Sequence, residues 1–184
     1  MNSLTDNSLM LKVKSGDLDK MGLLFERYHR PLYRFLYHMT GNKESCQDMV
    51  QNVFYRMLKY RHTFTGEGEF KTWMYHLSRN VLNDHIKQDK SVNHLDIQAL
   101  ADTLDSGISA DLHLEDKDNA ESIQNALSLM SAEHREILVL SRFQELKYDE
   151  IAGILNISEG AVKVRVHRAM GELKRTFLKN KRTV

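Results

Sequence analysis

The sequence contains very little cysteine and proline. Its 184 residues include one Cys, one Pro and 9 Gly. Because Cys46 is alone, it excludes an internal disulfide and a zinc site built from cysteines, and it makes a reducing cytoplasm the default location. A single proline and few glycines favour long regular elements with few tight turns. Strand signals are sparse, so the expected fold class is all-α.

Long hydrophobic runs are missing as well. No apolar stretch approaches the ~20 residues that a membrane-spanning helix needs, and the N-terminal stretch lacks the apolar block of a signal peptide. Hydrophobic residues make up 41% of the chain and charged residues 28%. This balance is ordinary for a folded protein and leaves enough apolar side chains to bury a core.

The net charge of +1 hides an uneven distribution. Residues 1–90 carry 14 Lys and Arg against 10 Asp and Glu, residues 91–127 carry 1 against 8, and residues 128–184 carry 11 against 7. Two basic segments therefore flank an acidic one. From Glu159 onward, 8 Lys and Arg stand against only Glu159 and Glu172. This excess points to a polyanionic partner, with a merely solvated face as the alternative.

Apolar periodicity predicts three helices in the N-terminal part, at about residues 18–40, 44–60 and 69–88. Gly41 ends the first helix, and Pro31 predicts a kink or a break within it. The intervening stretch RHTFTGEGEF contains two glycines and is expected to be a loop. The residues predicted to be buried include Met21, Leu24, Phe25, Tyr28, Leu32, Phe35, Met49, Val50, Val53, Phe54, Met57, Phe70, Trp73, Met74, Leu77, Val81 and Ile86.

The C-terminal part is predicted to contain four helices. Residues 91–119 are interpreted as an acidic linker, with one helical turn expected around residues 97–104. Helices are then expected at about residues 120–129, after the capping residue Ser131, along KYDEIAGIL, and after the capping residue Ser158. The last two, joined by a turn at Asn156 and Ile157, form a helix-turn-helix pattern. The residues predicted to be buried between them are Ile151, Ala152, Leu155, Val162, Val166 and Leu173.

The final helix has an outer face that is small, basic and partly apolar. A helix-turn-helix pattern alone also fits any helical hairpin. A recognition helix, however, must offer cations for phosphates and short residues that can approach base edges, and this face offers both. The residues predicted to contact DNA here are Ser158, Glu159, Gly160, Ala161, Lys163, Val164, His167 and Arg168.

Two stretches carry a family resemblance. The stretch LSLMSAEHREILVLSRFQELKYDEIAGILNISEGAVKVRVHRAMGELKR resembles the C-terminal promoter-binding domain of bacterial sigma factors, especially the small extracytoplasmic-function group. The stretch LFERYHRPLYRFLYHMTGNKESCQDMVQNVFYRMLKY, followed by FKTWMYHLSRNVLNDHIKQ, resembles the first conserved domain of that group, including its DxxQxxF core. Together they cover about four fifths of the chain in the right order.

The resemblance implies two domains, at residues 1–90 and 120–184, joined by the linker at residues 91–119. It implies an alternative sigma factor with core RNA polymerase, promoter DNA and an anti-sigma factor as partners. Residues 1–90 would bind the polymerase and would recognise and melt the promoter's −10 element, and residues 120–184 would recognise its −35 element. The residues matched to polymerase binding are Asp48, Gln51, Asn52 and Tyr55, which could otherwise be a solvated helix face.

Recognition of the −10 element is matched to the glycine loop and the helix after it. Strand opening needs a pocket or platform for extruded bases, which aromatic stacking and basic residues supply. Phe64 is the best candidate for a base contact, whereas the spacing of Trp73 with Phe70 and Leu77 favours a core position. The residues predicted to serve this element are Arg61, Phe64, Lys71, Tyr75, Arg79, Asn80 and Asn83.

Some positions depart from the family pattern. Lys147 stands where a capping Ser is common, so the first helix of the turn motif is expected to lack a side-chain cap. Ala161 and Val164 replace hydroxyl residues, and contact with thymine methyls could substitute for the lost donors. The acidic linker fits either a mimic of nucleic acid in polymerase channels or a plain solvated tether.

An enzyme is not expected. His113 with Glu115, and His134 with Glu136, have a spacing of two residues, which diverges on a helix and cannot form a facial metal-ligand set. No nucleophile motif or phosphate-binding glycine loop is present, so no cofactor or metal is expected. Two other functions stay open: a free-standing helix-turn-helix regulator, and a sigma-like mimic that titrates an anti-sigma protein without binding promoters.

Overall fold

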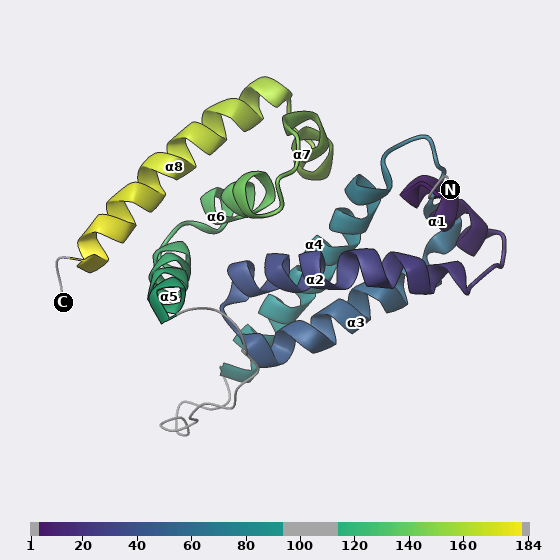
Figure 1. Cartoon of the computed structure of the whole chain (residues 1–184), viewed down its shortest axis with the longest axis horizontal. Coiled ribbons are helices and arrows are strands. Elements are labelled where there is room, and N and C mark those ends of the chain that lie inside the picture. Colours follow the sequence, from purple (N-terminus) through teal and green to yellow (C-terminus); the bar gives the residue numbers. More distant parts are fainter. Residues whose placement is uncertain (1–3, 94–113, 182–184) are drawn as a thin grey trace.

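The computed structural model of the chain describes residues 4–93 and 114–181, and these ranges contain helices without a strand (Figure 1). The predicted all-α class is confirmed. The N-terminal ranges are α1 (Asp6–Lys14), α2 (Lys20–Thr40), α3 (Lys43–Lys59), the short 3-10 helix η1 (Arg61–Thr63) and α4 (Phe70–Asn93). The C-terminal ranges are α5 (Leu114–Ser128), α6 (Ala132–Leu138), the π-helical turn η2 (Val139–Phe143), α7 (Tyr148–Leu155) and α8 (Glu159–Lys181). The helical turn expected around residues 97–104 lies outside the described residues.

Helix α1 was not predicted from the sequence. It begins where the Thr5 side chain accepts a hydrogen bond from the Ser8 N–H at 3.2 Å, which satisfies one of the free donors of its first turn. Leu9, Met10 and Val13 are fully buried, so tertiary packing stabilises this short helix. The spacing of these three apolar residues after a capping Thr is the signal that could have revealed it.

Helix α3 packs against both α2 and α4, and α1 packs against α2 near one end of it (Figure 1). Helix α2 continues through Pro31, so of the predicted kink or break the break is wrong, and the kink stays a prediction. The neighbouring residues Leu32, Phe35 and Leu36 are fully buried, and this packing holds the helix together where a backbone hydrogen bond is lost. Gly41 ends α2 in the left-handed conformation with φ 72°, as expected.

The predicted core of the N-terminal helices is confirmed with two exceptions. Phe25 is 43% exposed and Ile86 is 39% exposed, although both were expected to be buried. Phe25 lies at the edge of the apolar stripe of α2, where its ring packs 4.9 Å from that of Phe54 on α3. Trp73 is partly buried against the core, as its spacing predicted, and its Nε1–H donates to Thr63 at 3.1 Å.

Both predicted serine caps in the C-terminal part are confirmed. The Ser131 hydroxyl accepts from the His134 N–H at 3.4 Å, and the Ser158 hydroxyl accepts from the Ala161 N–H at 3.2 Å. Helix α4 extends beyond its predicted end, and α5 begins before its predicted start at Ala120. The intervening acidic composition therefore marked the connection but not the ends of the flanking helices.

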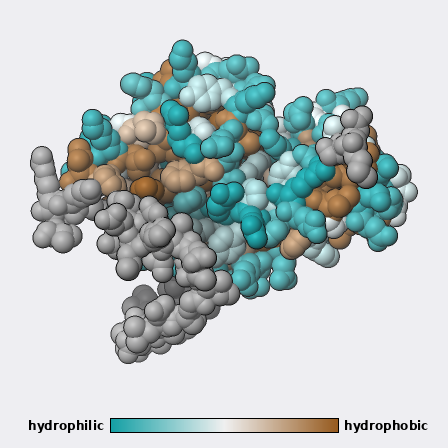
Figure 2. Space-filling model, in the orientation of Figure 1, coloured by the Kyte–Doolittle hydropathy of each residue, from teal (hydrophilic) through white to brown (hydrophobic). Residues whose placement is uncertain are grey.

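The surface in Figure 2 is largely hydrophilic, and its apolar side chains gather in patches. Among the exposed large apolar residues, Phe25 belongs to α2, Tyr55 to α3 and Val164 to α8. The latter two belong to faces that the sequence predicted to bind partners.

Candidate nucleic-acid interface and docking face

Helices α7 and α8 form the predicted helix-turn-helix. Asn156 adopts the left-handed conformation with φ 54° and ends α7, so the chain turns directly into α8. Ile151 and Val162 are fully buried where the two helices pack, as predicted. Ile154 is also fully buried, whereas the predicted Leu155 is only partly buried. Ala152 and Leu173, also predicted to be buried, are only partly buried, so the inward face of α7 is formed by Ile151 and Ile154.

The start of α7 lacks a side-chain cap from Lys147, as expected. The Lys147 N–H instead donates to Oε2 of Glu150 at 2.8 Å. This is one half of a capping box, in which a carboxylate in the first turn reaches back to the cap residue. The negative charge of this carboxylate also interacts favourably with the positive end of the helix dipole, which stabilises the first turn of α7 without a serine cap.

The outer face of α8 is exposed, as its sequence predicted. Val162 and Val166 turn inward, while Lys163, His167 and Arg168 remain exposed on the opposite side. Val164 is 48% exposed, so it presents its methyl groups where the family often has a hydroxyl. The structure therefore brings the predicted residues onto the first turns of one helix; they are Ser158, Glu159, Gly160, Ala161, Lys163, Val164, His167 and Arg168.

A polar contact fixes the angle of α8 against α6. His134 Nδ1 hydrogen-bonds Oε2 of Glu172, and the Ser131 N–H donates to the other carboxylate oxygen at 3.1 Å. The hydrogen bond with His134 is the main reason that the pKa of Glu172 is lowered. Glu136, two residues from His134, turns away to Arg79. The two side chains thus diverge, as their spacing predicted.

The glycine loop after η1 is anchored by an aromatic cluster. Phe64 is only 3% exposed, and its ring centroid lies 5.3 Å from that of Trp73 and 6.3 Å from that of Phe70. Its ring therefore holds the loop in place and is not free to stack on a base in this conformation. Arg61, also predicted for this site, donates to the Leu58 carbonyl at 2.8 Å.

A cavity of about 450 Å³ lies between the end of α3 and the middle of α4, and Thr63, the residue just before the glycine loop, is part of its lining. Asn80 and Asn83, both predicted from the sequence, line it and are exposed. Tyr60, which is 37% exposed, also lines it and was not predicted. An aromatic ring and two side-chain amides offer one stacking surface together with hydrogen-bond donors and acceptors for a base edge.

Three other residues predicted for the same site contact the C-terminal helices. Arg79 forms a forked ion pair with Glu136 on α6, with Nε–Oε1 at 2.7 Å and Nη2–Oε2 at 3.3 Å. Lys71 Nζ lies 3.5 Å from a carboxylate oxygen of Glu150 on α7. Tyr75, only 2% exposed, donates its hydroxyl to Gln144 Oε1 at 2.9 Å. The C-terminal helices therefore occupy part of the face that was predicted to read the −10 element.

Further contacts join the two sets of helices near the end of α2. Arg135 Nη1 donates to the Met39 carbonyl at 2.7 Å, and the same guanidinium donates to the Leu127 carbonyl at 2.8 Å. Nδ1 of His38 lies 2.9 Å from Oε1 of Gln124, and burial lowers the pKa of this histidine. These bonds join partly buried groups, so they give a defined geometry to the contact between the two sets of helices. We call the arrangement in which the two sets are in contact the closed arrangement.

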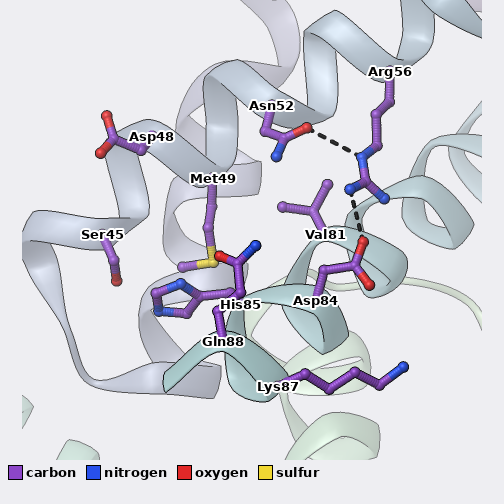
Figure 3. A pocket seen from close by; sticks show the side chains of 10 residues that line it. All are labelled: Ser45, Asp48, Met49, Asn52, Arg56, Val81, Asp84, His85, Lys87 and Gln88. Carbon is purple, nitrogen blue, oxygen red and sulfur yellow. Dashed lines mark hydrogen bonds and ion pairs between the residues drawn. The ribbon is translucent and has the colours of Figure 1, made fainter. Parts of the chain in front are cut away.

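The predicted polymerase-binding residues form the outer ridge of α3. Asp48, Gln51 and Asn52 are exposed, and Tyr55 is 61% exposed. A cavity of about 470 Å³ on one side of the ridge is lined by Asp48 and Asn52 together with residues of α4 (Figure 3). A second hollow of about 730 Å³ on the other side is lined by Gln51 together with residues of α2. A ridge between two grooves is the shape against which a partner helix packs.

The Asn52 side chain is the most constrained of these four. Its Oδ1 accepts from Nε of Arg56 at 3.1 Å, and Nη2 of Arg56 forms an ion pair with Asp84 at 2.7 Å (Figure 3). Asn52 thus belongs to a chain of contacts that joins α3 to α4. Within the described part of the chain, no such contact restrains the exposed side chains of Asp48 and Gln51.

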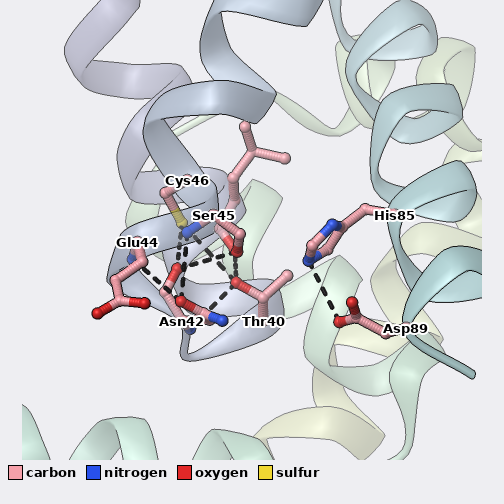
Figure 4. A network of polar contacts seen from close by, with 8 residues as sticks. Thr40, Asn42, Glu44, Ser45, Cys46, His85 and Asp89 are labelled. Atoms are coloured by element: carbon pink, nitrogen blue, oxygen red, sulfur yellow. Dashed lines mark hydrogen bonds and ion pairs between the residues drawn. The ribbon is translucent and has the colours of Figure 1, made fainter. Parts of the chain in front are cut away.

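The start of α3 is held by a network at its first turn (Figure 4). Oδ1 of Asn42 accepts from the N–H groups of Glu44 and Ser45 at 3.0 and 3.3 Å. The Cys46 thiol donates to the Asn42 carbonyl at 2.9 Å, and burial raises the pKa of this thiol. Cys46 is therefore a packed helix residue, and the ridge of α3 begins from a fixed point.

These observations define a class of protein. A helix-turn-helix with an exposed basic face is joined to a second helical unit that carries a cavity lined by an aromatic ring and side-chain amides and a ridge suited to a partner helix. This is a DNA-binding transcription protein with a protein partner. Comparison with known families gives the particular family.

Residues 24–92 match the family model "Sigma-70 region 2", and residues 120–173 match "Sigma-70, region 4". The ECF RNA polymerase sigma factor SigW of Bacillus subtilis (strain 168) is 30% identical over 172 residues, covering 89% of this chain and 92% of SigW. SigX of the same organism is 29% identical over 157 residues, covering 83% of this chain and 81% of SigX. The chain belongs to the ECF group of RNA polymerase sigma factors. It is an alternative sigma factor, which binds core RNA polymerase and directs promoter recognition.

Solved structures share the fold. One is CnrH in complex with the cytosolic domain of CnrY, with a TM-score of 0.70 and 20% identity, covering 92% of this chain and 95% of CnrH. Another is the sigma factor RpoE in complex with the anti-sigma factor NepR from Bartonella quintana, with a TM-score of 0.67 and 19% identity, covering 86% of this chain and 96% of RpoE. Proteins of this family are initiation factors and not enzymes. Within residues 4–93 and 114–181, no helix is long and apolar enough to cross a membrane.

Proposed function

We propose that this sigma factor divides promoter recognition between two domains, at residues 1–90 and 120–184, joined by the linker at residues 91–119. The first binds core polymerase and reads the −10 element, and the second reads the −35 element. The observation that supports this division best is the exposed basic face of α8, which stands apart from the cavity beside α4. The chain itself supplies no catalytic chemistry, and it acts in the cytoplasm, where the polymerase is.

At the −35 element, α8 enters the major groove with its first turns. Lys163 and Arg168 supply the cations for phosphates or guanines, and Val164 offers methyl groups to thymine methyls. Because Ser158 uses its hydroxyl to cap the helix, its role at the DNA is to fix the start of α8 rather than to read a base.

At the −10 element, the cavity beside α4 holds an unpaired base. Tyr60 supplies the stacking surface, and the amides of Asn80 and Asn83 read the base edge. Phe64 anchors the loop from inside, which its burial favours over a direct contact. Lys71 and Arg79 are available to backbone phosphates only after they leave their acidic partners on α7 and α6.

The closed arrangement cannot read both elements at once. The −35 and −10 positions are about 25 base pairs apart, which is about 85 Å of duplex at about 3.4 Å per base pair. Helix α8, with 23 residues, is only about 35 Å long, and α4 and α6 are in direct contact through Arg79 and Glu136. Binding to the polymerase must therefore separate the two domains before the promoter is engaged.

Polymerase docking uses the ridge of α3. Asp48 lines the hollow on one side of this ridge, and Gln51 lines the hollow on the other side. An anti-sigma factor is a further partner, because the sigma factor RpoE, which has a similar fold, is bound to the anti-sigma factor NepR. Such a partner would act by keeping the domains together.

Promoter-dependent transcription tests this function. The purified chain is added to core polymerase with a pool of promoter fragments, and the transcripts are sequenced. Products that start at a shared motif pair support the proposal, and the variant Lys163→Ala with Arg168→Ala should lose them. A mimic that titrates an anti-sigma factor would bind polymerase or anti-sigma factor without any promoter-dependent product. A free-standing regulator would bind duplex DNA without binding polymerase.

A further inference from the structure

Helix α1 fastens the loop that follows Thr63, a residue that lines the cavity beside α4. Nδ2 of Asn7 donates to the Gly68 carbonyl at 2.9 Å and lies 3.5 Å from the Gly66 carbonyl. Oδ1 of the same side chain accepts from the Phe70 N–H at 2.8 Å. One amide therefore bonds the middle of the loop and the first N–H of α4 at the same time.

A second residue of α1 holds the other end of the loop. Nζ of Lys14 donates to the Phe64 carbonyl at 2.6 Å. Between Asn7 and Lys14, the side chain of Leu11 lies so close to Gly66 that a Cβ there would be 3.1 Å from it. Gly66 also has a φ of 82°, so the chain needs glycine there both for its conformation and for the approach of α1.

The loop needs this support because its own sequence is permissive. Thr65, Glu67 and Gly68 are exposed, and within the loop the Glu67 N–H donates to the Thr65 hydroxyl at 3.3 Å. Glycine-containing loops lose much conformational freedom when they are ordered by a ligand. Contacts that order the loop beforehand remove that cost from binding.

We propose that Asn7 and Lys14 are positioning residues for recognition of the −10 element. By holding the backbone of residues 64–69, they keep the preceding Thr63 in the position at which it lines the cavity with Asn80 and Asn83. This inference rests on the proposed function of that cavity. Neither residue needs to touch DNA, because each acts through the loop carbonyls.

The test uses holoenzyme, formed from the full chain and core polymerase, and a pool of short single-stranded DNA randomised at the −10 positions. Bound DNA is sequenced, and the enrichment of the preferred base is measured at each position, with core polymerase alone as background. Asn7→Ala and Lys14→Ala should each lower this enrichment about tenfold, which corresponds to about 1.4 kcal/mol. Lys14→Arg keeps a donor and should retain most of it.

Two variants separate positioning from general stability. Lys12→Ala removes a cation from the exposed side of the same helix, and it should leave the enrichment unchanged. Asn7→Asp keeps the acceptor for the Phe70 N–H and suits the first turn of α1, but it loses the donors to the loop. It should therefore lose enrichment like Asn7→Ala, while its melting temperature and its affinity for core polymerase stay close to those of the wild type.

The outcomes distinguish this inference from the function on which it rests. If Asn80→Ala and Asn83→Ala lose the enrichment but Asn7→Ala and Lys14→Ala keep it, the positioning role is refuted and the cavity stands. If Asn7→Asp selects bases as well as the wild type, Asn7 only caps α4 and the inference is also refuted. If wild-type holoenzyme enriches no base, the function of the cavity itself fails.

Discussion

The forked ion pair between Arg79 and Glu136 gives the sharpest test of the closed arrangement. It joins α4 to α6 with donor–acceptor distances of 2.7 and 3.3 Å. The variant Glu136→Gln keeps the shape of the side chain and removes its charge. Arg79 on α4 retains its bond to the Ile154 carbonyl on α7 at 3.1 Å, so the variant should weaken the contact between the domains without abolishing it.

The size of the effect follows from the exposure of the pair. Hydrogen bonds to charged groups contribute about 1.5 to 3 kcal/mol, whereas exposed ion pairs contribute about 0 to 1 kcal/mol. The two side chains are 31% and 16% exposed, so the pair is partly buried. We therefore expect it to contribute a free energy near the upper end of the range for exposed ion pairs. A loss of about 1 kcal/mol shifts the balance between open and closed forms about fivefold.

The assay is a distance measurement on the free protein. Spin labels at Glu26→Cys and Asn125→Cys, both exposed and on α2 and α5, report the separation of the two sets of helices. Glu136→Gln should increase the population of long distances about fivefold, and Glu133→Gln, an exposed change on the same helix, should not. An identical distance distribution in both variants would refute the idea that this pair stabilises the closed form.

The remaining predictions concern DNA, polymerase and pH. Lys163→Ala and Arg168→Ala should each weaken binding to the −35 element by about 1 to 3 kcal/mol if the residue contacts a base, or lower the salt slope by about 1 if it contacts a phosphate; unchanged affinity and slope in both would show that another face reads the DNA. Asp48→Ala and Gln51→Ala should weaken polymerase binding in a titration while the affinity of the chain for −35 duplex stays the same. The pKa of Glu172 is lowered from its ordinary 4.5, so the carboxylate stabilises the fold above about pH 4.5 and that contribution is lost as the pH falls through the lowered pKa. Glu172→Gln should therefore be less stable than the wild type in urea unfolding at about pH 7, and the difference should shrink in acid.

Local patterns gave much of the fold in advance. Helix periods, the caps Ser131 and Ser158, and the turn at Asn156 depend on residues close together in the chain, so they could be predicted. The face of α8 could be predicted for the same reason, because a helix fixes which residues point the same way. Helix α1 was not predicted, because a helix this short is stable only when other elements cover its apolar side.

The sequence by itself determined an all-helical chain with a basic recognition helix and a polar ridge on α3. Only the tertiary structure decided which of the predicted residues have side chains that are free to contact DNA. The aromatic ring of Phe64 could stack on a base or fill a core, and only the packing of Trp73 and Phe70 around it selects the core. Arg79 could bind phosphate or a carboxylate, and only the approach of α6 gives it Glu136. Both choices depend on groups far apart in the chain, whose meeting no local pattern encodes.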